Sequence, residues 1–402
     1  MRKGTDRAAK AASAGARPER AEVARFVTET VDREGLVRIR DAWKALAGRA
    51  AEPNVFYDPD FALPAIEGLV AGAAIRALLV WCDDGPSGRR LTGVFPFIAK
   101  RRWSVPLSVG EAFIHPYAMS SAPLVDRQAV PETVAAFLDW LEGDTSPAAW
   151  LFRFLPEDGS LHAAFVDAAG LRKAALSRHG AYHRAVFDGG SVDERYLDVA
   201  LGSKRRKEYR RLRRRLADHG EVTVTRAEAP DTVAAGIDAF LALEAAGWKG
   251  ARGTAAALSP EIARMFKAIA AGLAASGQIR VDALTVDGKP VAVAVSCGEG
   301  TDWWFWKIAY DEDFATYSPG VQLVAEITQA AIAARDDETY DSCALPGIPM
   351  IERLWRQRRP YADVLIAPAT LGGLRGMAGR LETWRRRMEW LAKRALSAIG
   401  KR

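Results

Sequence analysis

The segment from residue 279 to residue 335 constrains the fold more than any other part of this sequence. Within 279–311, three runs rich in β-branched and aromatic residues are separated by the short turns VDGKP and CGEGTD, the pattern of antiparallel hairpins. The next run, 318–335, has helical spacing, with Ser318 placed to cap the helix and Pro319 in its first turn. Antiparallel hairpins followed by a helical connection predict a mixed α/β (α+β) fold.

The sequence on either side of this segment indicates two similar units in tandem. Between 196 and 370 the pattern predicts a helix, a strand, two helices, three strands, a helix, a strand, a helical turn and a strand. Residues 25–195 show a weaker version of that order: helix, hairpin, helix, strand, helix. A chain of 402 residues is long enough for two domains. We therefore expect a degenerate N-terminal domain over 25–195 and a C-terminal domain over 196–370, each a mixed sheet flanked by helices.

Positive charge is concentrated in three segments of the chain. Residues 203–215 hold nine lysines and arginines against one glutamate, residues 375–402 hold nine against two acids, and residues 1–25 hold seven against three. Their combined surplus exceeds the net charge of +6 of the whole chain, so the rest of the protein is acidic. Such segments favour contact with phosphates, anionic lipid or another polyanion. We expect residues 1–24 to be a disordered basic tail, because they lack an apolar rhythm.

Residues 371–402 are predicted to form a basic amphipathic helix. Its apolar residues fall near one face, namely Leu381, Trp384, Met388, Leu391 and Leu396. This pattern is typical of helices that lie on anionic membranes, and equally of a terminal helix that docks on its own domain. The basic segment 203–215 contains a single aromatic residue, Tyr209, so we expect no specific nucleic-acid binding there.

Disulfide and metal chemistry find little support in the sequence. The three cysteines, Cys82, Cys297 and Cys343, lie far apart and form no CxxC pair. His179 and His183 have the i, i+4 spacing, but the glycine between them disfavours a helix, so we expect no metal site. No charge-free apolar stretch of 18 residues and no secretory signal are apparent. We expect a cytoplasmic protein that can lie at the inner face of the membrane.

The start of helix 318–335 is the strongest candidate for an anion site. The backbone N–H groups of Gly320, Val321 and Gln322 would point at one spot, where the helix dipole adds positive potential. An ordinary Ser-Pro helix start has the same local sequence. The position favours a ligand site, because ligands often bind where a strand leads into a helix.

A set of motifs resembles the GNAT-type acyltransferases of the cellulose-biosynthesis (CelD-type) group, which are related in fold to the Fem-like aminoacyltransferases. The motifs are SKRRKEYRRLRRRL (203–216), FLALEAAGWKGARGTA (240–255), GKPVAVAVS (288–296), WKIAYDEDFATYSPGVQL (306–323) and YDSC (340–343). The resemblance covers 196–345 well and the first half only through short segments. It implies two tandem GNAT-like halves and the transfer of an acyl group to an amine.

The resemblance also implies where the acyl donor binds. The family fold holds acyl-CoA between two splayed strands, with the pyrophosphate on the N-terminal amides of the next helix. The family loop reads R/Q-x-x-G-x-G/A, whereas Tyr317–Val321 keeps one glycine. The donor therefore stays open between acetyl-CoA or another acyl-CoA and the aminoacyl-tRNA of Fem-like relatives. The donor-binding residues assigned on this basis are Lys307, Ser318, Pro319, Gly320, Val321 and Gln322.

N-acyl transfer needs an unprotonated amine, a polarised thioester carbonyl and a proton for the leaving thiolate. We expect a backbone N–H of strand 303–309 to polarise the carbonyl. The side chains assigned to proton transfer are Glu244 or Asp311 for the amine, and Tyr310 or Tyr317 for the thiolate. Those assigned to the acceptor are Trp248, Lys249 and Asp341. Purely structural roles stay open for three of these residues. Glu244 would be a solvated residue on a helix, Tyr310 would pack against its neighbours, and Lys307 would lie across the neighbouring tryptophans.

The acceptor that we expect is an amine of a saccharide, or of a cell-envelope or exopolysaccharide precursor. Two alternatives remain. One is a Fem-like transferase that uses aminoacyl-tRNA, and the other is a non-catalytic GNAT scaffold in polysaccharide synthesis.

Overall fold

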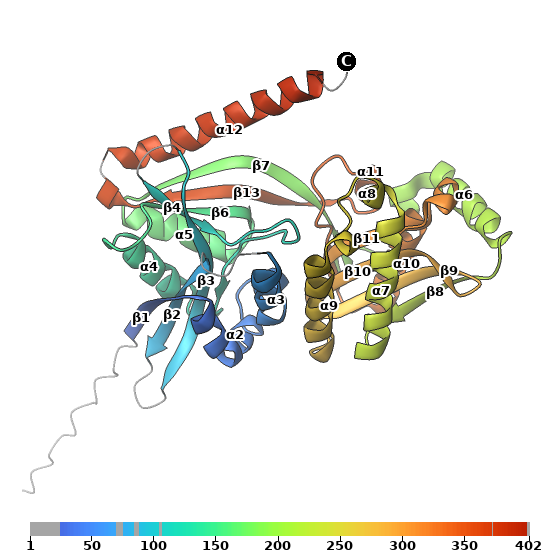
Figure 1. Ribbon diagram of the computed structural model, residues 1–402, viewed down its shortest axis with the longest axis horizontal. Coiled ribbons are helices and arrows are strands. Elements are labelled where there is room, and N and C mark those ends of the chain that lie inside the picture. The colour runs from blue at the N-terminus through green and yellow to red at the C-terminus, as the bar shows by residue number, and fades with distance from the viewer. Residues whose placement is uncertain (1–24, 70–74, 84–87, 104–106, 372, 400–402) are drawn as a thin grey trace, which may run out of the picture.

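The computed structural model describes residues 25–69, 75–83, 88–103, 107–371 and 373–399. The expected tail over 1–24 lies outside these residues. The described chain forms one mixed sheet with helices on both of its faces (Figure 1). The strands are β1 (Arg25–Val31), β2 (Ile75–Asp83), β3 (Arg89–Arg101), β4 (Ser108–Ala112), β5 (Leu124–Val125), β6 (Ala149–Pro156), β7 (Ala175–Asp188), β8 (Val222–Ala227), β9 (Ile279–Val286), β10 (Lys289–Glu299), β11 (Asp302–Tyr310), β12 (Thr339–Asp341) and β13 (Gln357–Ala367).

The helices lie between these strands, apart from α12 at the C-terminal end. They are α1 (Arg33–Arg38), α2 (Arg40–Ala47), α3 (Pro59–Leu69), α4 (Val130–Leu141), α5 (Ser160–Leu171), α6 (Tyr196–Ala217), α7 (Pro230–Ala246), α8 (Trp248–Ala251), α9 (Pro260–Ala275), α10 (Pro319–Ala334), α11 (Pro349–Glu352) and α12 (Leu374–Ile399). Short 3₁₀ turns are η1 (Val55–Tyr57), η3 (Gly189–Ser191), η4 (Ala256–Leu258), η5 (Glu312–Tyr317) and η6 (Ala369–Leu371).

One strand plan occurs twice along the chain. In the N-terminal half, β1 to β4 pair antiparallel in sequence order, and β4 then pairs in parallel with β6. In the C-terminal half, β8 to β11 pair antiparallel, and β11 pairs in parallel with β12. A helix makes each parallel connection, α4 in the first half and α10 in the second. The predicted mixed α/β fold, with two tandem halves that each hold a mixed sheet flanked by helices, is confirmed.

The last strand of each half is exchanged with the other half. β7 follows α5 but pairs with β12, while β13 at the end of the second half pairs with β6. β7 and β13 also pair with each other, in the middle of the strand order. Each half therefore completes its sheet with a strand from the other. The proposed boundary at 195/196 divides the sequence into two stretches and does not separate two bodies in space.

Apolar side chains fill both faces of the C-terminal part of the sheet. α7 and α9 cover one face, where Val293, Val295, Trp304 and Trp306 join a core that extends to Phe61 in α3. α10 covers the opposite face, against another set that includes Leu284, Ala294 and Phe305. β10 reads as a continuous apolar run because it is buried on both faces. α3 and α9 pack against each other, so the two halves share one core.

Candidate active site

β11 and β12 separate after only three paired residues. Asp302, Trp303 and Trp304 pair in parallel with Thr339–Asp341, and β11 then runs on to Tyr310. On the other edge of β11 the register with β10 shifts between Val295 and Ser296, which leaves Trp306 as a bulge residue. Cys343 has a left-handed backbone with φ of 55°, and its N–H donates to Asp341 Oδ1 at 2.8 Å. Residues 305–310 of β11 therefore have no strand partner on this edge among the described residues, and we call this unpaired edge the opening.

Lys307 lies at this opening and contacts the N-terminal half. Its Nζ is 4.9 Å from the centre of the Tyr117 ring, and the Trp306 Nε1–H donates to the Tyr117 carbonyl at 2.8 Å. Burial, with a smaller contribution from Lys249, lowers the pKa of Lys307 to about 8. Burial also lowers the pKa of His115, beside Lys307, to about 3. The opening thus combines a backbone edge with a lysine that titrates near physiological pH.

Four of the predicted residues meet at the C-terminal end of β11. Glu244, Trp248, Lys249 and Tyr310 line a small cavity of about 40 Å³, together with Glu312. Glu244 is only 7% exposed, so the reading of a solvated helix carboxylate is wrong. It accepts from Lys249 Nζ at 2.5 Å and from the backbone N–H of Ala256 at 2.8 Å.

Asp311 and Tyr317 lie outside the set that lines this cavity. The Asp311 carboxylate caps η5 by accepting from the N–H of Asp313 at 3.1 Å. The hydroxyl of Tyr317 lies 2.8 Å from His219 Nε2, and the Arg215 guanidinium lies over its ring. Both side chains make local contacts, as Glu244 does, and the proton-transfer roles assigned to them stay predictions.

The start of α10 differs from the anion site that the sequence predicts. Ser318 has a left-handed backbone, and its carbonyl accepts from the N–H groups of both Val321 and Gln322 at 3.1 Å. Two of the three expected donors are therefore engaged. In the described residues the Ser318 side chain makes no capping hydrogen bond. Pro319 and Gly320 are buried, and Gly320 packs near Ile308, Tyr310 and Met350.

The basic helix α6 lies beside this same region. Its backbone leaves helical geometry at Gly202, with φ of 67°, so the basic run forms its own helical segment. Arg213 Nη1 lies 3.5 Å from Gln322 Oε1, and Arg215 stacks over Tyr317 at 5.5 Å from the ring centre. α6 packs against both η5 and α10. Spacing alone could not show this, since about 100 residues separate the two segments.

Asp341 belongs to an internal polar cluster and also borders a larger cavity between the halves. It accepts from Arg184 Nη1 at 3.1 Å, from the Tyr361 hydroxyl at 2.6 Å and from the backbone N–H of Cys343. Arg184 is 1% exposed and also donates to the Met119 carbonyl in the N-terminal half. The cluster joins β7, β12 and β13, and the acceptor-binding role of Asp341 stays a prediction.

The described part of the chain contains no group of three or more metal-ligating side chains close enough to share an ion. Within the same residues, we find no helix that combines the length and the apolar composition needed to cross a bilayer.

The comparisons with known proteins agree with this geometry. Residues 203–346 match the family described as acetyltransferase (GNAT) domain. This segment is a GNAT-type acyltransferase domain. The GNAT domain contains β8 to β12 and α10, and hence the opening beside β11 and Lys307. None of the curated proteins matches the chain.

Two solved structures resemble the chain at low identity. The crystal structure of FemX has a TM-score of 0.55 and 12% identity, covering 83% of this chain and 97% of FemX. The C-terminal (DUF2156) domain of a putative lysylphosphatidylglycerol synthetase from Agrobacterium fabrum has a TM-score of 0.49 and 14% identity, covering 85% of this chain and 96% of its own. The likeness to FemX shows that the two-half fold is shared, and no more than the fold.

Proposed function

We propose that the protein transfers an acyl group from acetyl-CoA or another acyl-CoA to a primary amine, and that the donor lies in the opening between β11 and β12. The observation that carries this proposal is the length of β11 beyond its last pair with β12, inside the GNAT domain. An open strand edge presents N–H and C=O groups that can pair with an extended amide chain such as pantetheine. A backbone N–H near the Trp306 bulge would polarise the thioester carbonyl.

The side chains at the end of β11 supply the remaining chemistry. The amine nitrogen attacks the carbonyl carbon, the carbon–sulfur bond breaks, and the thiolate leaves. We assign Glu244 to accept the amine proton and Tyr310 to protonate the thiolate, while Trp248 and Lys249 border the acceptor. Lys307 is mostly protonated at neutral pH, because its pKa is about 8. Its ammonium group would stabilise the negative charge that develops on the carbonyl oxygen.

The donor phosphates are assigned to the surface formed by α6, η5 and the start of α10. Two first-turn amides of α10 are engaged by Ser318, so the guanidinium groups of Arg213 and Arg215 replace them as the main anion ligands. Arginine suits this role because its planar fork of N–H donors matches phosphate oxygens.

Changing Arg213 and Arg215 together to alanine should weaken acetyl-CoA binding by on the order of 10-fold to 100-fold. Binding of S-acetylpantetheine, which lacks the nucleotide, should stay unchanged. Calorimetric titration of both donors measures the two effects. Lys204→Ala with Arg205→Ala, at the far end of the same basic run, is the matched control. An equal loss for both donors would contradict this phosphate site.

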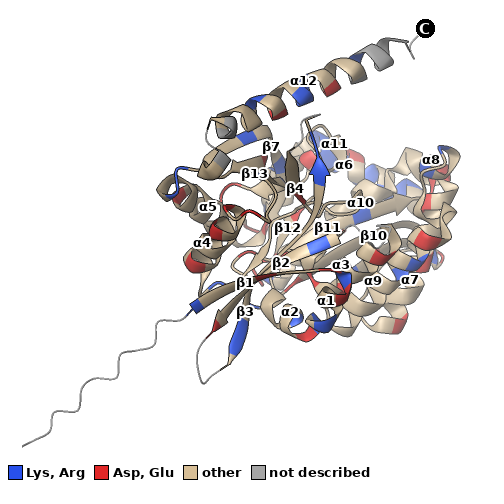
Figure 2. Cartoon of the chain, turned by 60° about the vertical axis from the view of Figure 1, so that its left-hand side comes forward, with Lys and Arg blue, Asp and Glu red and all other residues tan. Residues whose placement is uncertain are grey.

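We also propose that α12 places the protein on an anionic membrane surface. One side of the helix docks on the body through Ala378 and Glu382, which are buried. The opposite side carries a stripe of exposed apolar residues at helical spacing: Met377, Trp384, Met388 and Leu391. Figures 1 and 2 show α12 running above β7 and β13 and diverging from the body towards its C-terminal end. Leu381, expected on the apolar face, packs towards β13 instead, and the Leu396 side chain lies outside the described part.

Replacing Trp384 and Met388 by serine should lower binding to phosphatidylglycerol vesicles about 10-fold or more, because both side chains would lose apolar burial. Vesicle co-sedimentation at two salt concentrations measures this. The same substitution at Val166, an exposed apolar residue of α5, is the control. Binding that the Trp384/Met388 variant retains in full would exclude α12 as the contact.

The acceptor is proposed to be an amine of a saccharide or of a cell-envelope precursor. The support is the resemblance of the 306–323 motif to polysaccharide-associated transferases.

A further inference from the structure

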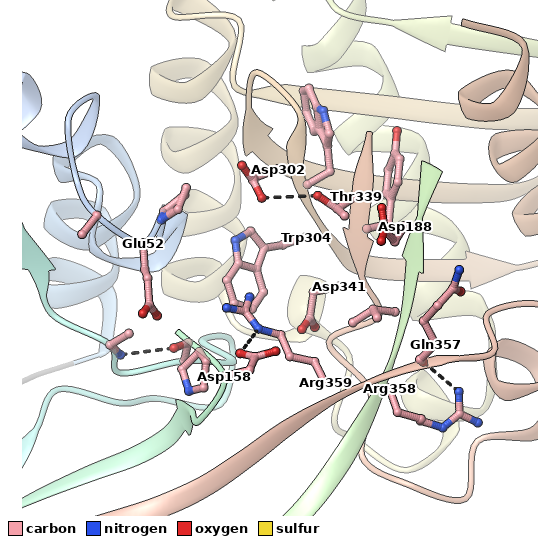
Figure 3. A pocket seen from close by; sticks show the side chains of 18 residues that line it. Glu52, Asp158, Asp188, Asp302, Trp304, Thr339, Asp341, Gln357, Arg358 and Arg359 are labelled. Atoms are coloured by element: carbon pink, nitrogen blue, oxygen red, sulfur yellow. Dashed lines mark hydrogen bonds and ion pairs between the residues drawn. The ribbon is translucent and has the colours of Figure 1, made fainter. Parts of the chain in front are cut away.

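A cavity of about 560 Å³ lies where the two halves of the protein meet, apart from the small cavity at the end of β11. Its walls come from the start of β11, from β12, from the ends of β7 and β13 that lie beside them, and from loops of the N-terminal half (Figure 3). This volume falls within the range of small-molecule sites. Strands of both halves build it, so the exchange of β7 and β13 defines its shape.

Acidic side chains dominate the lining of this cavity. Five carboxylates line it, against the guanidinium groups of Arg358 and Arg359: Glu52, Asp158, Asp188, Asp302 and Asp341. Arg359 Nε pairs with Asp158 at 2.9 Å, and Arg358 donates to the Trp355 and Gln357 carbonyls. Asp158 and Asp341 are paired with Arg359 and Arg184. Glu52, Asp188 and Asp302 then face Arg358 alone, so the cavity favours a cation over an anion.

Glu52 is the residue that points most directly to a ligand. It is 9% exposed, and its Oε1 accepts from the N–H of Leu161 at 2.9 Å. Its Oε2 has no hydrogen-bond partner among the described residues, although buried polar atoms are nearly always paired. Figure 3 shows Glu52 approaching the cavity from the N-terminal half, opposite the carboxylates of the sheet. Burial raises the pKa of Glu52, and the Leu161 N–H and the charge of Arg359 offset this only in part.

One residue that lines the cavity, Trp304, lies on the same face of β11 as Lys307. Trp304, which lines the cavity, pairs with Cys297, and Lys307 pairs with Val295 two residues further along β10. Residues two apart on a strand share a face, so Trp304 and Lys307 share one as well. The two positions are separated by roughly 7 Å along the sheet, because their partners are two residues apart on β10. A ligand in the cavity that is longer than this could reach the opening.

We propose that this cavity binds the saccharide part of the acceptor, a polyhydroxylated chain that carries amino groups. Ammonium and hydroxyl groups would donate to Glu52, Asp302 and Asp188, and the Trp304 ring would provide an apolar wall for a sugar ring. That the cavity is the acceptor site rests on the proposed function. That it binds an amino sugar chain does not depend on that function.

Titration of the full-length protein with a β-1,4-linked glucosamine tetramer tests this site. We expect the tetramer to bind and its fully N-acetylated counterpart, which lacks the positive charge, to bind at least about 10-fold more weakly. Glu52→Gln should weaken the tetramer about 10-fold, because the carboxamide keeps the shape but removes the charge. Glu194→Gln, at an exposed glutamate paired with Arg335, is the matched control and should have no effect.

The variants also separate this inference from a structural role and from the proposed function. If Glu52→Gln fails to fold, Asp302→Asn replaces it, since Asp302 is exposed at the rim. Acetyl-CoA should bind Glu52→Gln as it binds the wild type. A tetramer that does not bind, or binds no better than its acetylated counterpart, overturns the site even if acetyl-CoA binds. Failure to bind acetyl-CoA would overturn the proposed function and leave the tetramer result intact.

Discussion

Replacing Lys307 with methionine should lower kcat/KM for acyl transfer by about 100-fold or more and leave the protein folded. The loss follows from removing a positive charge from a partly desolvated site where carbonyl charge develops, an effect worth about 3–4 kcal/mol in comparable sites. Methionine keeps the apolar stem that lies across Tyr117 and Trp306. A thiol-release assay with acetyl-CoA and an amino sugar measures turnover, and circular dichroism checks the fold.

The pH dependence supplies a second readout of the same residue. The Lys307 ammonium loses its proton as the pH rises through about 8, so activity should fall on the alkaline side of that value. Lys307→Arg keeps its positive charge at higher pH. If this variant is active, its activity should therefore begin to fall at a higher pH than that of the wild type. Lys267→Met, at an exposed lysine of α9, is the control. A Lys307→Met enzyme with wild-type turnover and an unchanged pH profile would exclude Lys307 from the chemistry.

The largest loss of stability is expected from Asp341→Ala, at about 3–5 kcal/mol of unfolding free energy. Removing this carboxylate leaves the buried Arg184 guanidinium without its anionic partner, and such uncompensated buried charges cost this much. The Tyr361 hydroxyl and the Cys343 N–H lose their acceptor at the same time. Urea unfolding followed by fluorescence measures the change.

Two comparisons make the Asp341 result specific. Asp238→Ala removes an exposed pair with Lys267 and should cost less than about 1 kcal/mol. Combining Arg184→Met with Asp341→Ala should cost less than Asp341→Ala alone, because no unpaired charge is then buried. If Asp341→Ala is no worse than Asp238→Ala, the cluster does not join the exchanged strands as described.

The parts of the fold that local pattern determines could be predicted from the sequence. β9, β10, β11 and α10 follow from alternating apolar runs, short turns and a Ser-Pro helix start. β7 could not be predicted, since its residues alternate irregularly between buried and exposed, and its partners β12 and β13 come about 150 residues later. The exchange of strands depends on such distant pairing and leaves no local signal.

The candidate site shows the same division. Glu244, Trp248, Lys249 and Tyr310 were named from motifs, and they meet at one cavity. The anion site predicted at the start of α10 stays a prediction, and two of its three amides bond the Ser318 carbonyl. Tyr117, Arg184 and Glu52 were missed, since their roles depend on contacts between halves. Which partner a buried charged side chain has depends on the tertiary structure, and a single sequence does not reveal it.

Titration of the wild-type protein with acetyl-CoA, followed by addition of an amino sugar, tests the central claim most directly. The account predicts one donor site per chain with a dissociation constant in the micromolar range, on the order of −8 kcal/mol of binding free energy, and release of CoA only when the amine is present. Lys307→Met should bind the donor and release no CoA. Absence of binding by acetyl-CoA and by longer acyl-CoAs would contradict the account, and binding of aminoacyl-tRNA in their place would assign the opening beside β11 to a different donor.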